Sequence, residues 1–443
     1  MAVAKAVCFV FLHLFFNLAV AFKHSSAPVI TDRPFIVVWN APTQQCKWKY
    51  DVDLDFSLFD IVVNQNESFL GQNMTIFYSS RLGYYPYYSK DNTSVNGGVP
   101  QNASLKEHLG KAWEDIQTII PVNDFRGLAV IDWESWRPIW LRNWGSLKIN
   151  IQKSFELVKK QHPDWTPSQV NKVAQMEFES GAQAFMGKTL QLGLTLRSKG
   201  LWGFYRFPAC YNNDYKNTSH NYTGKCPDVE ISRNDKLKWL WENSTALYPE
   251  IYLEKELKGT EKALKFVYYQ LQEALKRAEQ TGYDYSIPVL PYSRIVYMYT
   301  FDFLTQDDLV YTIGESAAQG AAGVVLWGDA EYSSSKNNCQ TVKSYIDKVL
   351  GRYIMNVTHS VLLCSQALCT GNGRCVRKAE RSSAYLHLNP ETFLIKRNLG
   401  SGGPSFLVQG SLNKTDMTEM AESFLCQCYR GWKGAHCHIK TVQ

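Results

Sequence analysis

The 443-residue sequence has little that suits a membrane span, a nucleic-acid partner or a metal site. Its longest apolar stretch near the N-terminus, Val7 to Leu18, is shorter than the ~20 residues that a spanning helix needs. No basic run resembles a nucleic-acid-binding arm, and the formal charge of +6 needs no explanation beyond solubility. The nine histidines are scattered. We therefore expect no nucleic-acid partner, no metal and no cofactor.

Two common motifs are also missing. No Gly-x-Gly-x-x-Gly follows the first predicted strand, which disfavours a Rossmann-type open sheet. No Gly-x-Ser-x-Gly elbow supports a Ser-His-Asp hydrolase. Chemistry is therefore sought among carboxylates.

Several features indicate export. Lys5, the apolar stretch and Ala19-Val20-Ala21 are typical of a signal peptide, which predicts removal of residues 1–21. Of the 11 cysteines only Cys8 lies in this segment, and the even number that remains favours disulfides in an oxidising compartment. The chain ends without an apolar tail, so a glycolipid anchor is not expected. We expect a secreted, extracellular protein, with lysosomal or cell-surface association as alternatives.

Sequons for N-glycosylation agree with export. Each places Asn two residues before Ser or Thr, and an occupied sequon must face solvent. The candidate sites are Asn66, Asn73, Asn92, Asn102, Asn217, Asn221, Asn243, Asn356 and Asn413. Together with the signal peptide they favour a eukaryotic secretory route.

Apolar runs alternate with helical patterns between about residues 34 and 350. Most of the runs are continuously apolar, as expected for parallel strands buried on both faces. The predicted strands are residues 35–39, 74–78, 128–133, 201–207, 250–253, 287–292 and 323–327. Such a series of strand and helix units favours an α/β fold closed into a TIM-type (β/α) barrel.

Helix start signals support this alternation. Ser104 opens a capping box before a helix that reaches about Ile119, and Thr166 precedes Pro167 at the start of another. Thr305 caps a third helix. Further helices are predicted over residues 234–243, 256–281 and 338–350. Active sites of such barrels lie at the carboxyl ends of the strands.

The cysteines near the C-terminus have a spacing of their own. Cys364-x4-Cys369-x5-Cys375 and Cys426-x-Cys428-x8-Cys437 resemble an EGF-like module that is interrupted by an insert at residues 376–425. That resemblance implies three disulfides: Cys364–Cys375, Cys369–Cys426 and Cys428–Cys437. We expect a barrel domain at residues 22–355 and a disulfide-rich module at 356–443. A stapled appendage is favoured over a module that binds a cell-surface partner.

The most informative segment is an apolar strand that runs directly into Asp132-x-Glu134. Residues i and i+2 of a strand share a face, so both carboxylates point the same way at its carboxyl end. Adjacent carboxylates repel, which raises one pKa and retains a proton for the leaving oxygen of a glycosidic bond. The flanking residues that favour an active-site pair over solvated charge or a metal site are Trp133, Trp136 and Arg137.

Eight segments carry a resemblance to a known family. They are Trp39 to Pro42, Phe77 to Tyr87, Ala129 to Pro138, Gly200 to Tyr205, Trp239 to Trp241, Ala246 to Pro249, Gly314 to Trp327 and Cys364 to Cys369. On these residues nearly the whole mature chain resembles the animal hyaluronidases, glycoside hydrolase family 56. It is most similar to vertebrate sperm-surface and type-4 members, whose Val-Asn-Gly-Gly and Tyr-Leu-His-Leu-Asn-Pro segments recur at Val95 and Tyr385.

The resemblance implies a distorted barrel and a retaining mechanism in which the substrate's own N-acetyl oxygen is the nucleophile. Glu134 would be the general acid and base. Asp132 would hold the acetamido N–H and stabilise the oxazolinium-like intermediate. The implied reaction is hydrolysis of internal β-1,4 bonds of a glycosaminoglycan polymer.

Further positions carry over one by one. Tyr252 corresponds to the tyrosine that helps to hold the acetamido group. The residues that would line the substrate groove are Tyr78, Arg137, Tyr205 and Trp327. The resemblance also implies the disulfides Cys210–Cys226 and Cys46–Cys339.

Two residues depart from the family pattern. Glu250 stands where the family often has Ser, and an extra carboxylate there could repel a uronate or shift the pH range. Ala209 replaces a common Asp, which we interpret as a minor structural change. Three functions are weighed: hyaluronan hydrolysis, which the intact Asp132 and Glu134 favour, chondroitin or chondroitin sulfate hydrolysis, and hyaluronan-binding adhesion without catalysis.

Overall fold

The computed structural model describes residues 23–63, 70–71, 73–217, 221–380, 382–398 and 405–441. The predicted signal peptide, residues 1–21, and the sequon Asn66 lie outside the described residues. No helix in the described part of the chain combines the length and apolar character that crossing a bilayer requires.

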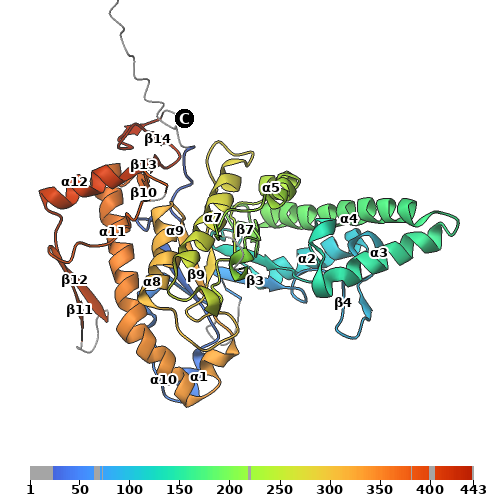
Figure 1. Cartoon of the computed structure of the whole chain (residues 1–443), viewed down its shortest axis with the longest axis horizontal. Coiled ribbons are helices and arrows are strands. Elements are labelled where there is room, and N and C mark those ends of the chain that lie inside the picture. The colour runs from blue at the N-terminus through green and yellow to red at the C-terminus, as the bar shows by residue number, and fades with distance from the viewer. Residues whose placement is uncertain are drawn as a thin grey trace, which may run out of the picture.

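Parallel strands form the centre of the molecule (Figure 1). Four of them pair in the order β2 (Ile61–Val63), β1 (Ile36–Asn40), β9 (Gly323–Trp327) and β8 (Tyr292–Ser293). Three more pair in the order β3 (Met74–Tyr78), β6 (Leu128–Asp132) and β7 (Leu201–Phe204). Single parallel bridges connect the two groups: Tyr205–Tyr248, Leu247–Val289 and Glu250–Tyr292. The expected distorted TIM-type barrel is confirmed.

The distortion has a local origin. Residues 250–253, predicted as a strand, contribute one bridge at Glu250 and no ladder, and the predicted strand 287–292 pairs as a ladder only at its end. The predicted strand 201–207 ends at Phe204, and Arg206 has a left-handed φ of 70°. The short strand Ile61–Val63 was missed by the sequence reading, because three residues carry too little pattern.

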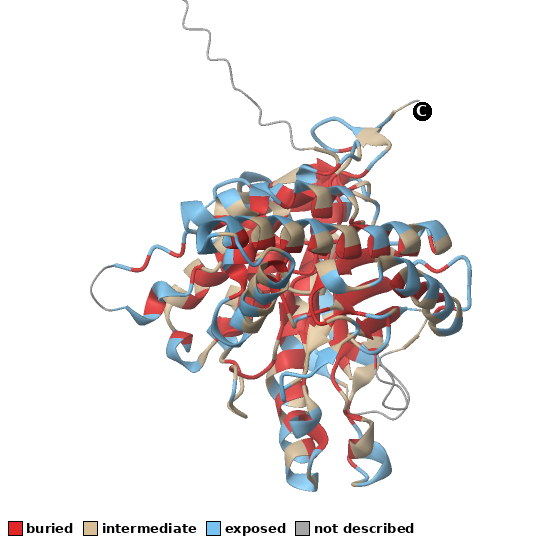
Figure 2. Ribbon diagram, turned by 90° about the vertical axis from the view of Figure 1, so that its right-hand side faces the viewer, coloured by how far each residue is buried: buried red, intermediate tan, exposed pale blue. Residues whose placement is uncertain are grey.

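Helices surround the strands, and buried and exposed residues alternate along them (Figure 2). Ser104 and Thr166 accept the cap hydrogen bonds of α2 and α4, and Thr305 does the same for α8. The helices in the barrel region are α1 (Gln44–Trp48), α2 (Leu105–Ile119), α3 (Lys148–Gln161), α4 (Pro167–Leu196), α5 (Asp228–Asp235), α6 (Lys238–Glu242), α7 (Glu261–Glu279), α8 (Gln306–Leu309) and α9 (Glu315–Ala318). Helices α3 and α4 pack together and extend to one side, beyond the strands (Figure 1).

Apolar side chains from the strands fill the barrel interior. A buried cluster draws on six of the seven strands of the two sheets and on the bridged segment, and Leu201 of β7 packs against it, so the interior is a packed core rather than a channel. Its members include Ile36, Val38, Ile61, Met74, Ile76, Leu128, Val130, Tyr248, Leu290 and Val325. Polar groups are therefore confined to the ends of the barrel.

The C-terminal part is joined to the barrel by one long helical stretch. Helix α10 (Lys336–Tyr345) continues through residues 346–350 into α11 (Gly351–Cys369). This stretch crosses the boundary expected between residues 355 and 356, and the two-domain division stays a prediction. The remaining elements are β10 (Gly373–Arg377), β11 (Phe393–Arg397), β12 (Phe406–Gly410), α12 (Lys414–Ser423), β13 (Phe424–Cys428), β14 (Trp432–Lys433) and β15 (Ile439–Lys440).

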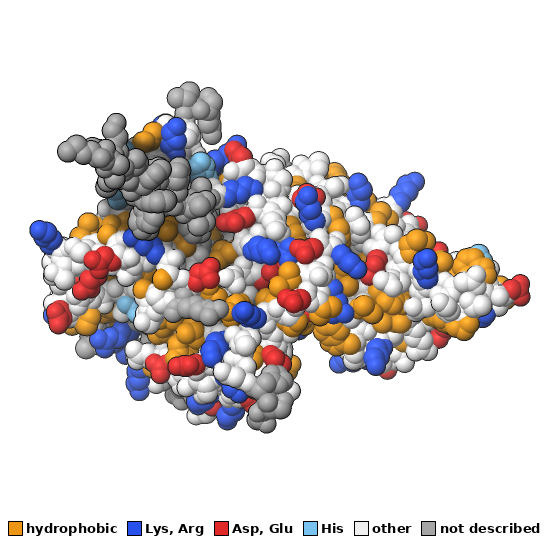
Figure 3. Space-filling model, turned by 45° about the horizontal axis from the view of Figure 1, so that its top comes forward, with side chains coloured by type: hydrophobic (Ala, Val, Ile, Leu, Met, Phe, Trp, Pro, Cys, Tyr) orange, Lys and Arg blue, Asp and Glu red, His pale blue; other side chains and the backbone are white. Residues whose placement is uncertain are grey.

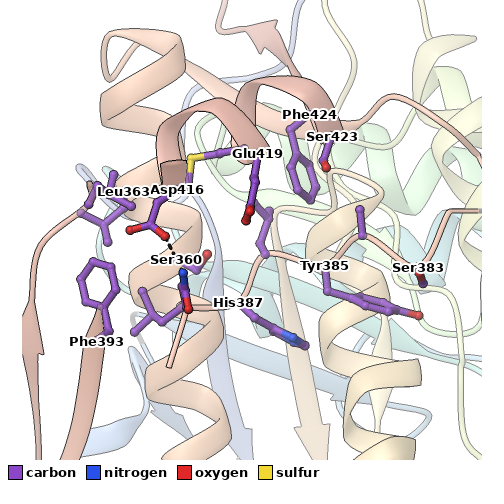
Figure 4. A pocket seen from close by; sticks show the side chains of 16 residues that line it. Ser360, Leu363, Ser383, Tyr385, His387, Phe393, Asp416, Glu419, Ser423 and Phe424 are labelled. Atoms are coloured by element: carbon purple, nitrogen blue, oxygen red, sulfur yellow. Dashed lines mark hydrogen bonds between the residues drawn. The ribbon is translucent and has the colours of Figure 1, made fainter. Parts of the chain in front are cut away.

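The insert at residues 376–425 has structure of its own. Strands β11 and β12 pair as an antiparallel hairpin, and α12 leads back to β13, which pairs with β10. A hollow of about 330 Å³ lies between α11, α12 and residues 383–389 (Figure 4). On its wall Asp416 accepts a hydrogen bond from Asn389 at 2.7 Å, and His387 contacts the Tyr353 hydroxyl at 2.9 Å. The first contact lies within the insert, and the second ties the insert to α11.

Buried arginines hold the C-terminal part against the barrel. Arg377 forms a two-pronged ion pair with Glu315 of α9, and both side chains are almost fully buried. Arg374 donates to the Pro34 carbonyl and to the Ser25 hydroxyl. Over the face drawn in Figure 3, basic and acidic side chains are interspersed, as ordinary solubility requires.

Five disulfides connect the same cysteines that the resemblances imply. They are Cys46–Cys339, Cys210–Cys226, Cys364–Cys375, Cys369–Cys426 and Cys428–Cys437. Three of them lie in the C-terminal part. The first joins α1 to α10 across 293 residues and so ties the beginning of the barrel to its end.

We predict that removing Cys46–Cys339 as a Cys46→Ser, Cys339→Ser pair lowers the free energy of unfolding by about 2–5 kcal/mol, because the denatured chain regains the freedom of a long loop. Denaturant titration measures this change. As a matched control, the pair Cys210→Ser, Cys226→Ser opens a loop of only 16 residues and should cost less. A larger loss from the short loop would contradict the expectation.

Candidate active site

The carboxyl ends of the strands bring polar and aromatic side chains together. Asp132 ends β6 and pairs in register with Tyr78 at the end of β3. One cavity of about 110 Å³ lies at this end. Its lining is Ile76, Tyr78, Val130, Asp132, Glu134, Tyr205, Tyr252, Tyr292 and Trp327. Six of the seven site residues expected from the sequence thus share one cavity, and Arg137 lies at its edge.

Glu134 is the open member of the carboxylate pair. Its side chain is 50% exposed, and its Oε1 atom is 3.4 Å from both the Arg137 Nη2 and the Arg206 Nη1 atoms. Arg137 also donates to the Glu134 backbone carbonyl at 2.9 Å. The acid is therefore held by two guanidinium groups and still faces the groove.

Asp132 is the enclosed member. Burial, together with the nearby charge of Glu134, raises the pKa of Asp132 to about 7. Its Oδ1 atom is buried and has no hydrogen-bond partner among the described residues. At acidic pH the pair thus retains a proton, and one buried oxygen is available to a ligand.

Aromatic rings form the wall opposite the carboxylates. The rings of Tyr252 and Trp327 are stacked at 6.1 Å, and Tyr205 lies 6.5 Å from Tyr252. Burial raises the pKa values of Tyr205 and Tyr252 well above the usual range, so both hydroxyls stay protonated. Burial also raises the pKa of Tyr78 to about 12. Flat apolar faces with fixed hydroxyls suit a sugar ring.

The two tryptophans beside the acid support the site from behind. Trp133 stacks on Tyr85 at 4.7 Å, and Trp136 donates to the Pro86 carbonyl at 2.8 Å. Both are buried in the core between the strands and α4. Asn143 accepts from the Arg137 backbone N–H at 2.9 Å and fixes that loop. The tryptophans therefore set the position of Glu134 rather than contact a ligand.

Three site residues were missed by the sequence reading. Tyr292 ends a predicted strand and lines the cavity, so its place at a strand end was the available signal. Arg206 follows another strand end, but no spacing rule identifies it. Arg294 stacks over Trp327 at 4.9 Å and pairs with Asp329 at 2.7 Å, which only the fold brings together.

Glu250, which stands where the family often has Ser, has defined partners. Its Oε2 atom accepts a hydrogen bond from the Tyr205 hydroxyl at 2.5 Å and lies 3.9 Å from the Arg206 Nε atom. Its side chain is 20% exposed. The extra carboxylate is thus directed toward Tyr205 and Arg206.

Similarity to known proteins identifies the family of this chain. Residues 24–441 match the glycoside hydrolase family 56 model, described as Hyaluronidase. The chain belongs to this family. Hyaluronidase-1 of Sus scrofa is 50% identical over 424 residues, which is 96% of this chain and 96% of that protein. Hyaluronidase-1 of Bitis arietans is 48% identical over 419 residues, which is 95% of this chain and 93% of its own length.

A solved hyaluronidase has the same fold. The crystal structure of bee venom hyaluronidase in complex with a hyaluronic acid tetramer matches with a TM-score of 0.64 and 32% identity, over 72% of this chain and 97% of that one. The resemblance read from the sequence is confirmed, and the protein is a glycoside hydrolase of the hyaluronidase family. Its carboxylate pair lies at the barrel end where active sites of this fold are built.

The raised pKa of Asp132 predicts a pH-dependent stability. The unfolded chain ionises Asp132 near its ordinary value and the folded protein only at about 7, so this group destabilises the fold progressively as pH rises between those values. Asp132→Asn cannot ionise. We expect it to match the wild type near pH 4 and to exceed it by on the order of 1–3 kcal/mol near pH 8.

Denaturant unfolding at both pH values measures the difference. Asp124→Asn is the control, because a hydrogen bond from Lys199 lowers the pKa of this exposed carboxyl, and its removal should give no gain at high pH. Equal pH dependence of Asp132→Asn and the wild type would show that Asp132 ionises normally.

Proposed function

We propose that this hyaluronidase-family protein hydrolyses internal β-1,4 bonds of hyaluronan by a retaining, substrate-assisted mechanism, with Glu134 as general acid and base. The observation that carries the proposal is the single cavity that holds Asp132, Glu134, Tyr252 and Trp327 together. The hyaluronic acid tetramer bound by the bee venom relative supports the choice of polymer.

In the first step, Glu134 protonates the glycosidic oxygen as the bond from C1 to that oxygen breaks. The carbonyl oxygen of the substrate's N-acetyl group then bonds to C1 and forms an oxazolinium-like ring. The half-exposed position of Glu134 suits proton transfer to a group in the groove. The guanidinium groups of Arg137 and Arg206 hold the carboxylate that remains.

Asp132 is assigned to the acetamido N–H. Its buried Oδ1 atom has no partner in the described chain, and a buried acceptor of this kind gains most from a donor that the substrate brings. The proton that the pair retains has to lie on Glu134 for the first step, which leaves the Asp132 carboxylate to accept the acetamido N–H while the acetamido oxygen attacks C1. The Tyr252 hydroxyl, kept protonated by burial, is assigned to donate to that oxygen.

In the second step, water attacks C1, and Glu134 accepts its proton as the oxazolinium-like ring opens. The new hydroxyl at C1 has the configuration of the bond that was cleaved, because C1 has been attacked twice. Glu134 is left protonated for the next cycle.

Chondroitin or its sulfates are the alternative substrate class. Glu250, the departure that raised this question, directs its charge to Tyr205 and Arg206. It therefore gives no reason to exclude a uronate from the catalytic cavity. Binding without hydrolysis is the third candidate, and the complete pair of carboxylates weighs against it.

Secretion is part of the proposal. Five disulfides in one chain suit an oxidising compartment. All eight described sequon asparagines are in exposed or half-exposed positions, where a glycan can be carried: Asn73, Asn92, Asn102, Asn217, Asn221, Asn243, Asn356 and Asn413. The C-terminal module is given a structural role, and a cell-surface partner remains the second option.

We predict that the secreted chain releases reducing ends from hyaluronan and that Glu134→Gln lowers kcat at least about 100-fold, because an amide cannot donate the proton. A reducing-end assay on hyaluronan, chondroitin and chondroitin sulfate measures the hydrolytic activity of the wild type and of Glu134→Gln, and it identifies the preferred polymer. Folded wild-type protein that leaves all three polymers intact would refute hydrolysis. An active Glu134→Gln enzyme would refute the assigned acid.

Stereochemistry tests the mechanism separately. We expect the first reducing ends to appear as the β anomer, since substrate-assisted cleavage retains configuration. Proton NMR during the first minutes of hydrolysis distinguishes the anomers before mutarotation mixes them. Initial release of the α anomer would exclude attack by the acetamido oxygen.

A further inference from the structure

A second hollow, of about 130 Å³, lies next to the catalytic cavity, and we refer to it as the adjacent hollow. Tyr252 lines both spaces, so the two adjoin at this ring. The residues that line the adjacent hollow include Arg206, Tyr211, Asn213, Glu250, Glu254 and Tyr299. Of the residues that line it, only Arg206 and Tyr252 have a role in the mechanism above, and the space itself has none.

Backbone strain is concentrated here. Among the described residues, nine that are not glycine have a left-handed φ, and three of these nine line the adjacent hollow: Arg206 at 70°, Tyr211 at 52° and Tyr299 at 60°. Such residues usually are Asn or Asp, and bulky side chains in this region persist only where surrounding contacts fix them. Strained residues of this kind cluster at ligand sites.

Contacts on three sides fix Arg206. Its backbone N–H donates to the Tyr248 carbonyl at 2.8 Å. Its guanidinium group lies between two carboxylates, with Nη1 3.4 Å from Glu134 and Nε 3.9 Å from Glu250. Glu250 is itself held by the Tyr205 hydroxyl. The position of the cation is therefore set before any ligand binds.

The Arg206 guanidinium has donors to spare. Of its five N–H groups, only one on Nη1 is within hydrogen-bond distance of an acceptor in the described chain. Its side chain is 36% exposed, toward the groove that Glu134 also faces. The other carboxylate of the hollow, Glu254, is paired with Lys216. A planar group with free donors suits a carboxylate or sulfate of a sugar.

Tyr299 supplies an apolar surface at the edge of the same hollow. It is 88% exposed, the highest value among the exposed large hydrophobic residues of the described chain. An aromatic ring held open to solvent in a strained backbone conformation has no role in the core. Its face suits the C–H side of a sugar ring.

We propose that the adjacent hollow is a saccharide subsite beyond the catalytic cavity, in which Arg206 binds an anionic group of the polymer and Tyr299 stacks on a sugar ring. This rests on the proposed function, since it assumes a glycosaminoglycan in the groove. Both uronate carboxylates and sulfate esters have the required chemistry. Glu250 accepts a hydrogen bond from the Tyr205 hydroxyl, and in this fixed position it holds the Arg206 guanidinium.

Binding to the Glu134→Gln protein tests the proposal without turnover. Calorimetry compares hexasaccharides of hyaluronan, unsulfated chondroitin and chondroitin sulfate with this parent and with Arg206→Gly or Tyr299→Ala added. Glycine takes a left-handed φ at no cost, so Arg206→Gly should unfold no earlier than the parent. Arg206→Gln is a second neutral variant if the glycine variant fails to fold. Arg126→Ala, at an exposed site outside both spaces, is the matched control.

We expect Arg206→Gly to raise Kd about tenfold and to weaken its salt dependence, because one ion pair is lost. Tyr299→Ala should raise Kd at least about threefold for every ligand it stacks on. A loss for all three hexasaccharides assigns the contact to the carboxylate, and a loss for the sulfated one alone assigns it to sulfate.

Two failures remain distinguishable. Unchanged Kd for folded Arg206→Gly and Arg206→Gln, with a parent that binds, would overturn the subsite and leave the proposed function intact. A folded parent that binds none of the hexasaccharides would count against the proposed function itself.

Discussion

The site depends on one constraint, the burial of the Asp132 carboxyl beside the charge of Glu134 at the end of the barrel. In water two such groups would both ionise at acidic pH. Here burial removes the hydration that stabilises the Asp132 anion, and Glu134 adds its own charge, so the pair retains a proton up to a pH of about 7. The proton belongs to the pair, and it has to lie on Glu134 at the moment the leaving oxygen departs.

The rest of the fold serves this arrangement. Apolar side chains fill the barrel below Asp132 and exclude water, while stacked aromatic rings close the opposite wall. Arg137 and Arg206 hold Glu134 without enclosing it. The disulfide Cys46–Cys339 joins the first and last parts of the barrel. Each of these contacts restricts where the carboxylates can lie, so the chemistry is prepared before substrate binds.

The barrel and most of the site residues were predictable from the sequence, because the signals for them lie in short segments of the chain. The strand that leads into Asp132-x-Glu134 has a pattern that fixes the direction of both side chains, and helices with good caps begin where Ser104 and Thr166 indicate. Tyr78, Tyr205 and Trp327 follow strand ends, which parallel topology brings to one edge. The barrel and the family were therefore accessible before any coordinates.

What escaped prediction depends on tertiary contacts. The segment after Pro249 has a strand-like composition, but in the fold it pairs with its neighbour only through one bridge, at Glu250. The helix from Lys336 to Cys369 continues through the point where the repeating pattern stops. Arg206 and Glu250 come into contact because their segments are neighbours at the barrel end, and neither spacing nor residue type alone predicts that contact.

The most direct test is to measure the titration of Asp132 itself. Carboxyl-carbon NMR of protein labelled at aspartate, with Asp132→Asn used to assign the signal, follows this group across the pH range. We predict an apparent pKa of about 7 for Asp132, as a property of the pair with Glu134. A signal that titrates near 4, the ordinary value of an aspartate, would show that the barrel does not retain the proton and would contradict the basis of the proposed mechanism.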